Sequence, residues 1–279
     1  MSYRSLLLYL DSDERCAERT QVAISLAKSL DCHLVGLAPT GRVEFPDFGG
    51  AGLGLDSVTE AWGLLHRRSE AAAQRFAEAC KEFRLASFET VVVEEDKADA
   101  LVRHAHCSDL CILGQADPAS RNPGLDRDIV QRVVLHSARP TLVLPHAGTF
   151  KSLGQRVMVA WDDSREAARA IADAMPLLRG ADQVQLVCWN DPGQEDAAAT
   201  SARLESVRRW LLWHGVKAQA RVETSGIGIT DAMLSRAADF NADLLVMGAY
   251  GHARLTEWML GGATRGLLNA MSLPVLMSH

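Results

Sequence analysis

Four glycines near the C-terminus have the type and spacing that suit anion binding. They are Gly248, Gly251, Gly261 and Gly262, and they follow the apolar run Asp243–Met247. Because glycine has no side chain, the backbone N–H groups of such a loop can approach an anion closely. The loop leads into a predicted helix, whose N-terminus favours negative charge. The sequence therefore predicts a phosphate-binding loop in a nucleotide site.

The elements that must position this loop occur twice along the chain. Each half has five short, nearly all-apolar strands that alternate with helices, which is typical of a parallel sheet covered on both faces. The predicted strands span 5–11, 33–37, 88–93, 110–114 and 139–144 in the first half, and 156–162, 183–189, 218–223, 244–248 and 273–277 in the second. The fold class is α/β, with two tandem doubly wound domains at 1–148 and 155–279. Ligands of such sheets bind beyond the carboxyl ends of the strands, where the strand order switches.

Composition narrows the function classes. The net charge of −6 argues against a broad contact with nucleic acid. No apolar run reaches the roughly 20 residues that span a bilayer, so no membrane partner is expected. The N-terminal apolar run ends at Asp11 and predicts a first strand rather than a signal peptide.

Six scattered cysteines without a CxxC pair are expected to be reduced in a cytoplasmic protein. The cluster from His104 to Cys111 is an alternative zinc site, but its donors run from a helix end into a strand, so no metal ligand is assigned.

Three features of the second half together resemble a known family. The opening strand ends in Asp162-Asp163-Ser164, the four glycines follow the pattern Gly, two residues, Gly, nine residues, Gly and then a small residue, and a closing strand begins at Leu273-Pro-Val-Leu. The second half resembles the universal stress protein domain, and the whole chain resembles a tandem universal stress protein. The resemblance implies a five-stranded parallel sheet in the order 3-2-1-4-5, a role in the stress response, and ATP as the bound cofactor, with Mg²⁺ held through the phosphates.

The resemblance also implies which residues contact the nucleotide. By position they are Ala160, Asp162, Trp189, Gly248, Gly251, Gly261, Gly262, Ala263 and Thr264. Asp162 would contact the nucleoside, Trp189 would border the adenine, and the residues from Gly261 onward would present backbone N–H groups to the phosphates. The family often has Ser where this chain has Gly262, so a hydroxyl is lost there, although Thr264 supplies one two residues later. Backbone donors dominate such a site, so we expect binding to persist.

The first half departs much further from the family pattern. After Gly114, Asp117 stands in place of the second glycine, and Asp126 and Asp128 put negative charge where the anion-binding helix should begin. Carboxylates suit a helix N-terminus and would take the place of phosphate there. Pro118 and Pro123 also remove N–H donors. We therefore expect only the second half to bind a nucleotide.

Three functions remain open from the sequence. The first is an ATP-binding protein that signals to a downstream protein partner through its nucleotide occupancy. The others are a nucleotide-independent interaction module and a slow ATPase. No Walker lysine, GxSxG or HExxH pattern is present, so no catalytic residue is assigned and efficient turnover is not expected. The apolar strands ending at Leu144 and Met277 would pair within one chain, giving a pseudo-two-fold monomer, with a homodimer as the alternative.

Overall fold

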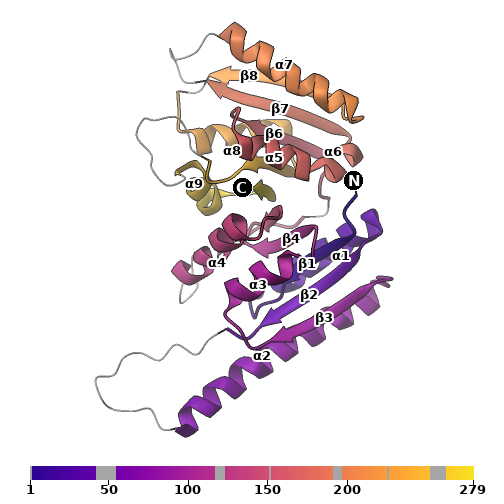
Figure 1. The fold of residues 1–279 in the computed structure, drawn as a ribbon, viewed down its shortest axis with the longest axis vertical. Coiled ribbons are helices and arrows are strands. Elements are labelled where there is room, and N and C mark those ends of the chain that lie inside the picture. Colours follow the sequence, from indigo (N-terminus) through magenta and orange to yellow (C-terminus); the bar gives the residue numbers. More distant parts are fainter. Residues whose placement is uncertain are drawn as a thin grey trace, which may run out of the picture.

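The chain folds into two similar halves that share one sheet (Figure 1). The structure is a computed structural model that describes residues 2–41, 55–116, 123–150, 152–190, 197–224, 226–251 and 262–279, without the side chains of 55–58, 123–127 and 197. The segment 39–56, which the sequence predicts to be a mobile cover loop, lies mostly outside these ranges, as do Gly261, Asp117 and Pro118.

The sheet has ten strands in the order β3-β2-β1-β4-β5-β10-β9-β6-β7-β8. Each half thus has the expected order 3-2-1-4-5, and all pairs are parallel except β5 with β10. The strands are β1 (Ser5–Tyr9), β2 (His33–Pro39), β3 (Phe88–Val93), β4 (Leu110–Gly114), β5 (Thr141–Leu144), β6 (Arg156–Trp161), β7 (Gln183–Asn190), β8 (Ala218–Thr224), β9 (Leu244–Gly248) and β10 (Val275–Ser278). The predicted α/β fold class is confirmed.

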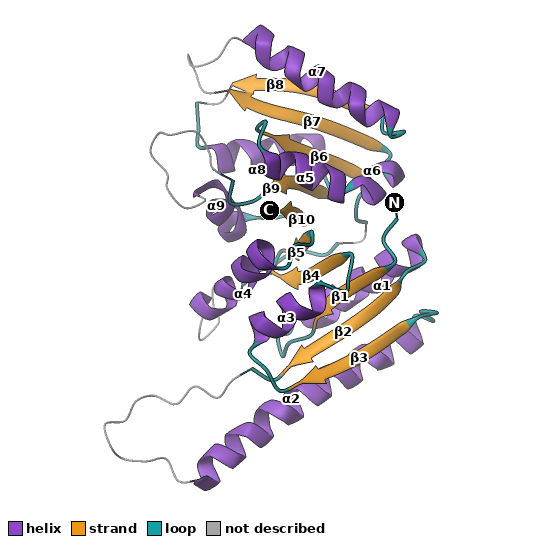
Figure 2. Ribbon diagram, viewed as in Figure 1, coloured by secondary structure: helices purple, strands orange, loops and turns teal. Residues whose placement is uncertain are grey.

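Helices cover both faces of the sheet, as Figure 2 shows. One face packs against α1 (Cys16–Leu30), α2 (Leu55–Glu82), α5 (Arg165–Asp173), α6 (Met175–Gly180) and α7 (Ala197–Trp213). The other packs against α3 (Lys97–Ala105), α4 (Pro123–His136), α8 (Ile229–Phe240) and α9 (Gly262–Ala270). Each face forms one apolar cluster with residues from both halves, so the core runs through the junction without a break. None of the helices in the described ranges is both long and apolar enough to cross a membrane.

The last strands of the two halves join the sheet. Val275 of β10 lies opposite Val143 of β5 in antiparallel register. This pairing, expected from the apolar character of both strands, gives the chain its pseudo-two-fold arrangement and leaves neither strand as an open edge. A buried phenol adds a second tie, because the Tyr3 hydroxyl of the first half donates to the Asp173 carbonyl oxygen of the second at 2.6 Å.

Some element bounds differ from the sequence expectation for local reasons. The helical pattern of residues 167–178 predicts one helix, but this segment lies in two helices, α5 and α6, which meet at Ala174. Pro176 stands at the start of α6, where its missing N–H is tolerated, whereas inside a continuous helix it would break the hydrogen-bond pattern. The closing strands begin after Pro140 and Pro274 for a related reason, since proline cannot donate to a neighbouring strand.

Candidate functional site

The switch in strand order of the second half lies between β6 and β9, and Asp162 directly follows β6. Its Oδ1 accepts hydrogen bonds from the Ser164 backbone N–H at 3.1 Å and from the Ser164 hydroxyl at 2.5 Å. Ser164 in turn caps α5 by accepting from Ala167 N–H at 3.1 Å. The N-cap of α5 is therefore Ser164, and Asp162 orients the Ser164 hydroxyl. The Asp162 carboxylate is exposed and, within the described ranges, faces no cation.

Gly248, the last residue of β9, brings helix and strand into close contact. A Cβ atom added at Gly248 would lie 2.5 Å from the Ala167 backbone nitrogen and 2.7 Å from the Glu166 carbonyl carbon. Backbone atoms cannot move aside as the end of a side chain can, so any side chain here would push α5 away from the sheet. The packing of α5 on β9 is thus sufficient to require this glycine, whether or not a ligand also passes close to it.

Gly251 covers a buried carboxylate. A Cβ atom at Gly251 would lie 2.9 Å from Glu166 Oε2, and Glu166 is only 3% exposed. Burial by itself would raise the pKa of Glu166, but the hydrogen bond from Arg165 Nε, its own backbone N–H and the nearby charges of Arg165 and His279 outweigh it and lower that pKa. Glu166 also lies in the first turn of α5, where a negative charge is stabilised by the helix dipole. The Glu166 carboxylate is therefore the negative charge that stabilises the N-terminus of α5.

The start of α9 is tied to the glycine loop. Thr264, which is 3% exposed, accepts a hydrogen bond at its Oγ1 from the Tyr250 backbone N–H at 3.2 Å. Tyr250 has a positive φ of 55°, which turns the loop sharply after β9. Gly262 and Ala263 open α9 and are half-buried. Three of the four predicted phosphate-binding positions thus lie together at one helix N-terminus, and the fourth, Gly261, is outside the described ranges.

Two further predicted site residues lie at or near the ends of neighbouring strands. Ala160 in β6 is 7% exposed and packs within the apolar cluster on one face of the sheet. Trp189 lies near the end of β7, is half-buried and packs against the same cluster. Both are on the sheet edge that carries Asp162 and Gly248, because the carboxyl ends of parallel strands meet at one edge.

The equivalent switch point in the first half is filled by an arginine. Asp11, which follows β1 as Asp162 follows β6, pairs with Arg19, whose Nη2 lies 2.5 Å from Asp11 Oδ1. The Arg19 side chain is only 4% exposed and also lies 3.7 Å from Asp13. Burial by itself would lower the pKa of Arg19, but the charges of Asp11, Cys16 and Asp13 raise it. The guanidinium lies against the end of β4, with its Cζ 3.0 Å from a Cβ added at Gly114. In the first half, the Arg19 guanidinium therefore occupies the space between the end of β4 and α1.

The helix after each fourth strand shows a second difference between the halves. Each residue from β4 to β5 is equivalent to the residue 134 positions later, from β9 to β10. Position 114, at the end of β4, is equivalent to 248 at the end of β9, and 144, at the end of β5, is equivalent to 278 at the end of β10. Asp128, which is exposed in α4, therefore corresponds to Gly262, and buried Val130 corresponds to Thr264. α4 begins at Pro123, so Asp126 lies in its first turn. The first half has acidic and apolar side chains where the second has a glycine and a hydroxyl.

The alternative zinc cluster is divided by the fold. Cys111 is fully buried in β4, and burial raises its pKa to about 12, whereas Cys107 is exposed in the preceding turn. In the described ranges no three His, Cys, Asp or Glu side chains are grouped closely enough to hold a metal ion.

Glu166 and Arg19 were missed as site residues in the sequence. Glu166 follows Asp162 by four residues and Arg19 follows Asp11 by eight. In the sequence, each is simply a charged residue near the start of a helix. Charged residues are common there on solvent-facing turns, so neither position indicates a site. A closer comparison of the two halves would have shown that Arg19 corresponds to Ala170, but it would not have shown that the guanidinium folds back over Gly114.

Comparison with known proteins gives one family and a fold match over the full length. The model of the universal stress protein family matches residues 154–279. A universal stress protein from Archaeoglobus fulgidus DSM 4304 matches 98% of this chain and 95% of its own, with a TM-score of 0.71 at 17% identity. A protein of unknown function from Pseudomonas aeruginosa PAO1 matches 99% of this chain and 92% of its own, with a TM-score of 0.62 at 14% identity. No curated protein matches this chain in sequence.

A third structure is a universal stress protein in complex with cAMP. It matches 52% of this chain and 98% of its own at 14% identity, and its TM-score of 0.39 is too low to place a ligand in this chain. The family model covers the second half, and the two full-length matches share the fold of the whole chain. Residues 154–279 match the model of the universal stress protein family, and over its full length the chain has the fold of a universal stress protein.

Proposed function

We propose that this chain binds ATP in its second half and acts in a cytoplasmic stress response by signalling its nucleotide occupancy to a protein partner. The first half, residues 1–148, is the structural partner of the binding domain, residues 155–279. One observation carries the proposal: Asp11 is neutralised by buried Arg19, whereas the corresponding Asp162 is exposed and forms no ion pair with any cation in the described part of the chain. The chain has closed one switch point and kept the other open to a ligand.

The start of α9 supports phosphate binding at the open site. Gly262, Ala263 and Thr264 are the first residues of the helix, so their N–H groups have no partner within the helix. The helix dipole adds positive potential at the same place. The Thr264 hydroxyl accepts from Tyr250 N–H and keeps its own proton as a donor. These donors would bind phosphate oxygens, and Mg²⁺ would be held through the phosphates.

An exchange of corresponding residues tests this proposal. Gly262→Asp gives α9 the carboxylate that α4 has at Asp128. An acidic residue is compatible with a helix start, so the fold should persist, but it would repel phosphate. By calorimetry, the unchanged chain should bind one ATP, and Gly262→Asp should weaken that binding at least tenfold. The matched control, Asp128→Gly, should leave ATP affinity unchanged. Absence of ATP binding up to millimolar concentration in the unchanged chain, with no nucleotide released when it is denatured, would refute the proposal.

A nucleotide-independent interaction module is the second candidate, and Glu166 favours it. Its buried carboxylate lies under Gly251, on the side of the loop from which it would repel a phosphate. Under this alternative, Gly248 and Gly251 are required only by packing, because a side chain at either position would collide with α5 or with the Glu166 side chain. Glu166→Gln separates the two candidates. If the site binds phosphate, removal of this negative charge should strengthen ATP binding. If the chain is a nucleotide-independent module, the variant should bind no ATP, like the unchanged chain.

A further inference from the structure

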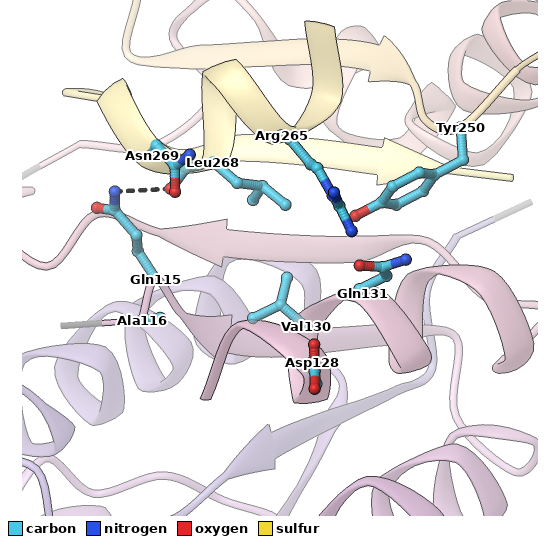
Figure 3. A pocket seen from close by; sticks show the side chains of 9 residues that line it. All are labelled: Gln115, Ala116, Asp128, Val130, Gln131, Tyr250, Arg265, Leu268 and Asn269. Atoms are coloured by element: carbon cyan, nitrogen blue, oxygen red, sulfur yellow. Dashed lines mark hydrogen bonds between the residues drawn. The ribbon is translucent and has the colours of Figure 1, made fainter. Parts of the chain in front are cut away.

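A cleft of about 370 Å³ lies between the two halves (Figure 3). Its size is within the range of roughly 300–1,000 Å³ that small-molecule sites occupy. Its walls come from α4 and α9 and from the residues that follow β4 and β9: Gln115, Ala116, Asp128, Val130, Gln131, Tyr250, Arg265, Leu268 and Asn269. It therefore exists only because the two halves are joined.

One end of the cleft is cationic and rich in hydrogen-bond donors. Figure 3 shows the Arg265 guanidinium and the Tyr250 phenol pointing toward one another, with the Gln131 amide facing them from α4. Burial raises the pKa of Tyr250 to about 12, although the Arg265 charge acts in the opposite direction, so the phenol keeps its proton at neutral pH. Within the described ranges, no carboxylate forms an ion pair with Arg265. The Asp128 carboxylate lies on the α4 wall, below Val130 in this view.

The middle of the cleft is apolar. Val130 is 4% exposed and reaches in from α4, and Leu268 reaches in from α9 on the opposite wall. Beyond them, Gln115 is already occupied, because its Nε2 donates to the Leu268 carbonyl oxygen at 2.8 Å and its Oε1 accepts from His146 N–H at 3.0 Å. The bond to Leu268 ties the end of β4 to α9, and the bond from His146 ties it to the residues after β5.

The pseudo-two-fold arrangement makes the chemistry of the cleft one-sided. At the spacing of 134, Ala116 corresponds to Tyr250, and Gln131 corresponds to Arg265. A symmetric cleft would have two cations or none, whereas this one has a single guanidinium beside a phenol and small or neutral groups opposite. A ligand can therefore bind in only one orientation.

We infer that this cleft binds a small amphipathic carboxylate. The carboxylate would lie against Arg265, which can donate two parallel hydrogen bonds to it, with the Tyr250 hydroxyl and the Gln131 amide as further donors. The apolar body would lie between Val130 and Leu268. A larger polyanion such as a triphosphate fits poorly, because the apolar middle and Asp128 lie where its other charges would have to go. The inference does not depend on ATP binding at the glycine loop.

Benzoate is the probe for this site, and benzamide is its neutral counterpart. By calorimetry or by NMR titration of the full chain, benzoate should bind one to one with a dissociation constant on the order of 1 mM, as suits so small a ligand. Arg265→Gln, which installs the residue found at the corresponding position 131, should weaken benzoate binding at least tenfold. Tyr250→Phe should weaken it roughly threefold. Arg209→Gln, on the exposed side of α7, is the matched control and should change nothing.

Several outcomes would overturn the inference. They are equal binding of benzamide and benzoate, unchanged benzoate binding in Arg265→Gln, and no benzoate binding up to about 20 mM. Asp162→Ala separates this site from the proposed nucleotide site, because it should abolish ATP binding and leave benzoate binding intact. Loss of benzoate binding in Asp162→Ala would place the probe in the nucleotide site and would also contradict the inference.

Discussion

The difference between Asp11 and Asp162 makes a quantitative prediction about stability. Asp11→Asn removes the charge that faces Arg19, whose side chain is 4% exposed. Removal of one partner from a buried ion pair costs about 3–5 kcal/mol. The Asp11 side chain is 19% exposed, and Asp13 remains 3.7 Å from the guanidinium, so we expect the free energy of unfolding to fall by about 2–3 kcal/mol. For a chain of this size, that corresponds to a fall of roughly 3–5 °C in Tm.

Asp162→Asn is the matched control for this experiment. The amide oxygen of Asn can still accept from Ser164, and no ion pair among the residues that the structure describes is lost. Its free energy of unfolding should stay within about 0.5 kcal/mol of the unchanged chain. Urea unfolding followed by circular dichroism, together with scanning calorimetry, measures both variants. Equal losses in the two variants, or a larger loss for Asp162→Asn, would refute the account of a closed and an open switch point.

Three other substitutions test the packing around the site. Gly248→Ala should lower the free energy of unfolding by about 2 kcal/mol or more in urea titrations, because its Cβ would meet the Ala167 backbone nitrogen at 2.5 Å; a neutral effect would show that α5 is not tightly seated. Tyr3→Phe should cost about 1 kcal/mol by the same measurement, since it removes the hydrogen bond to the Asp173 carbonyl oxygen; stability equal to the unchanged chain would contradict a role in joining the halves. The folded-state pKa of Glu166 is lowered, so its ionised form stabilises the fold above the unfolded pKa, and that contribution is lost as the pH falls through the folded pKa. Glu166→Gln should therefore flatten the decline in Tm below about pH 4.5, and an unchanged acid decline would exclude this carboxylate as a contributor.

The arrangement of strands could be predicted from the sequence because its signals are local and repeated. Each half has five short apolar runs, and runs such as Leu110–Gly114 and Leu244–Gly248 correspond closely between the halves. The pairing of β5 with β10 followed from the cost of leaving two apolar strands unpaired. The break between α5 and α6 was missed, although Pro176 is a signal that could have located it.

The reason for each glycine could not be predicted in the same way. The spacing of Gly248 and Gly251 suggests close approach to a ligand, yet both also admit parts of α5, which is far from them in sequence. That approach depends on how closely the helix packs on the sheet, and no local pattern records it. The same holds for Arg19, whose guanidinium reaches Gly114 across nearly a hundred residues of sequence.

Titration of ATP into the full chain, with the stoichiometry read by calorimetry, tests the central claim most directly. One ATP should bind per chain, with an affinity that falls at least tenfold in Gly262→Asp and is unchanged in Asp128→Gly. Two ATP molecules per chain would show that Arg19 does not close the first switch point. No binding at all, in a chain that also releases no nucleotide on denaturation, would show that the second switch point is closed as well.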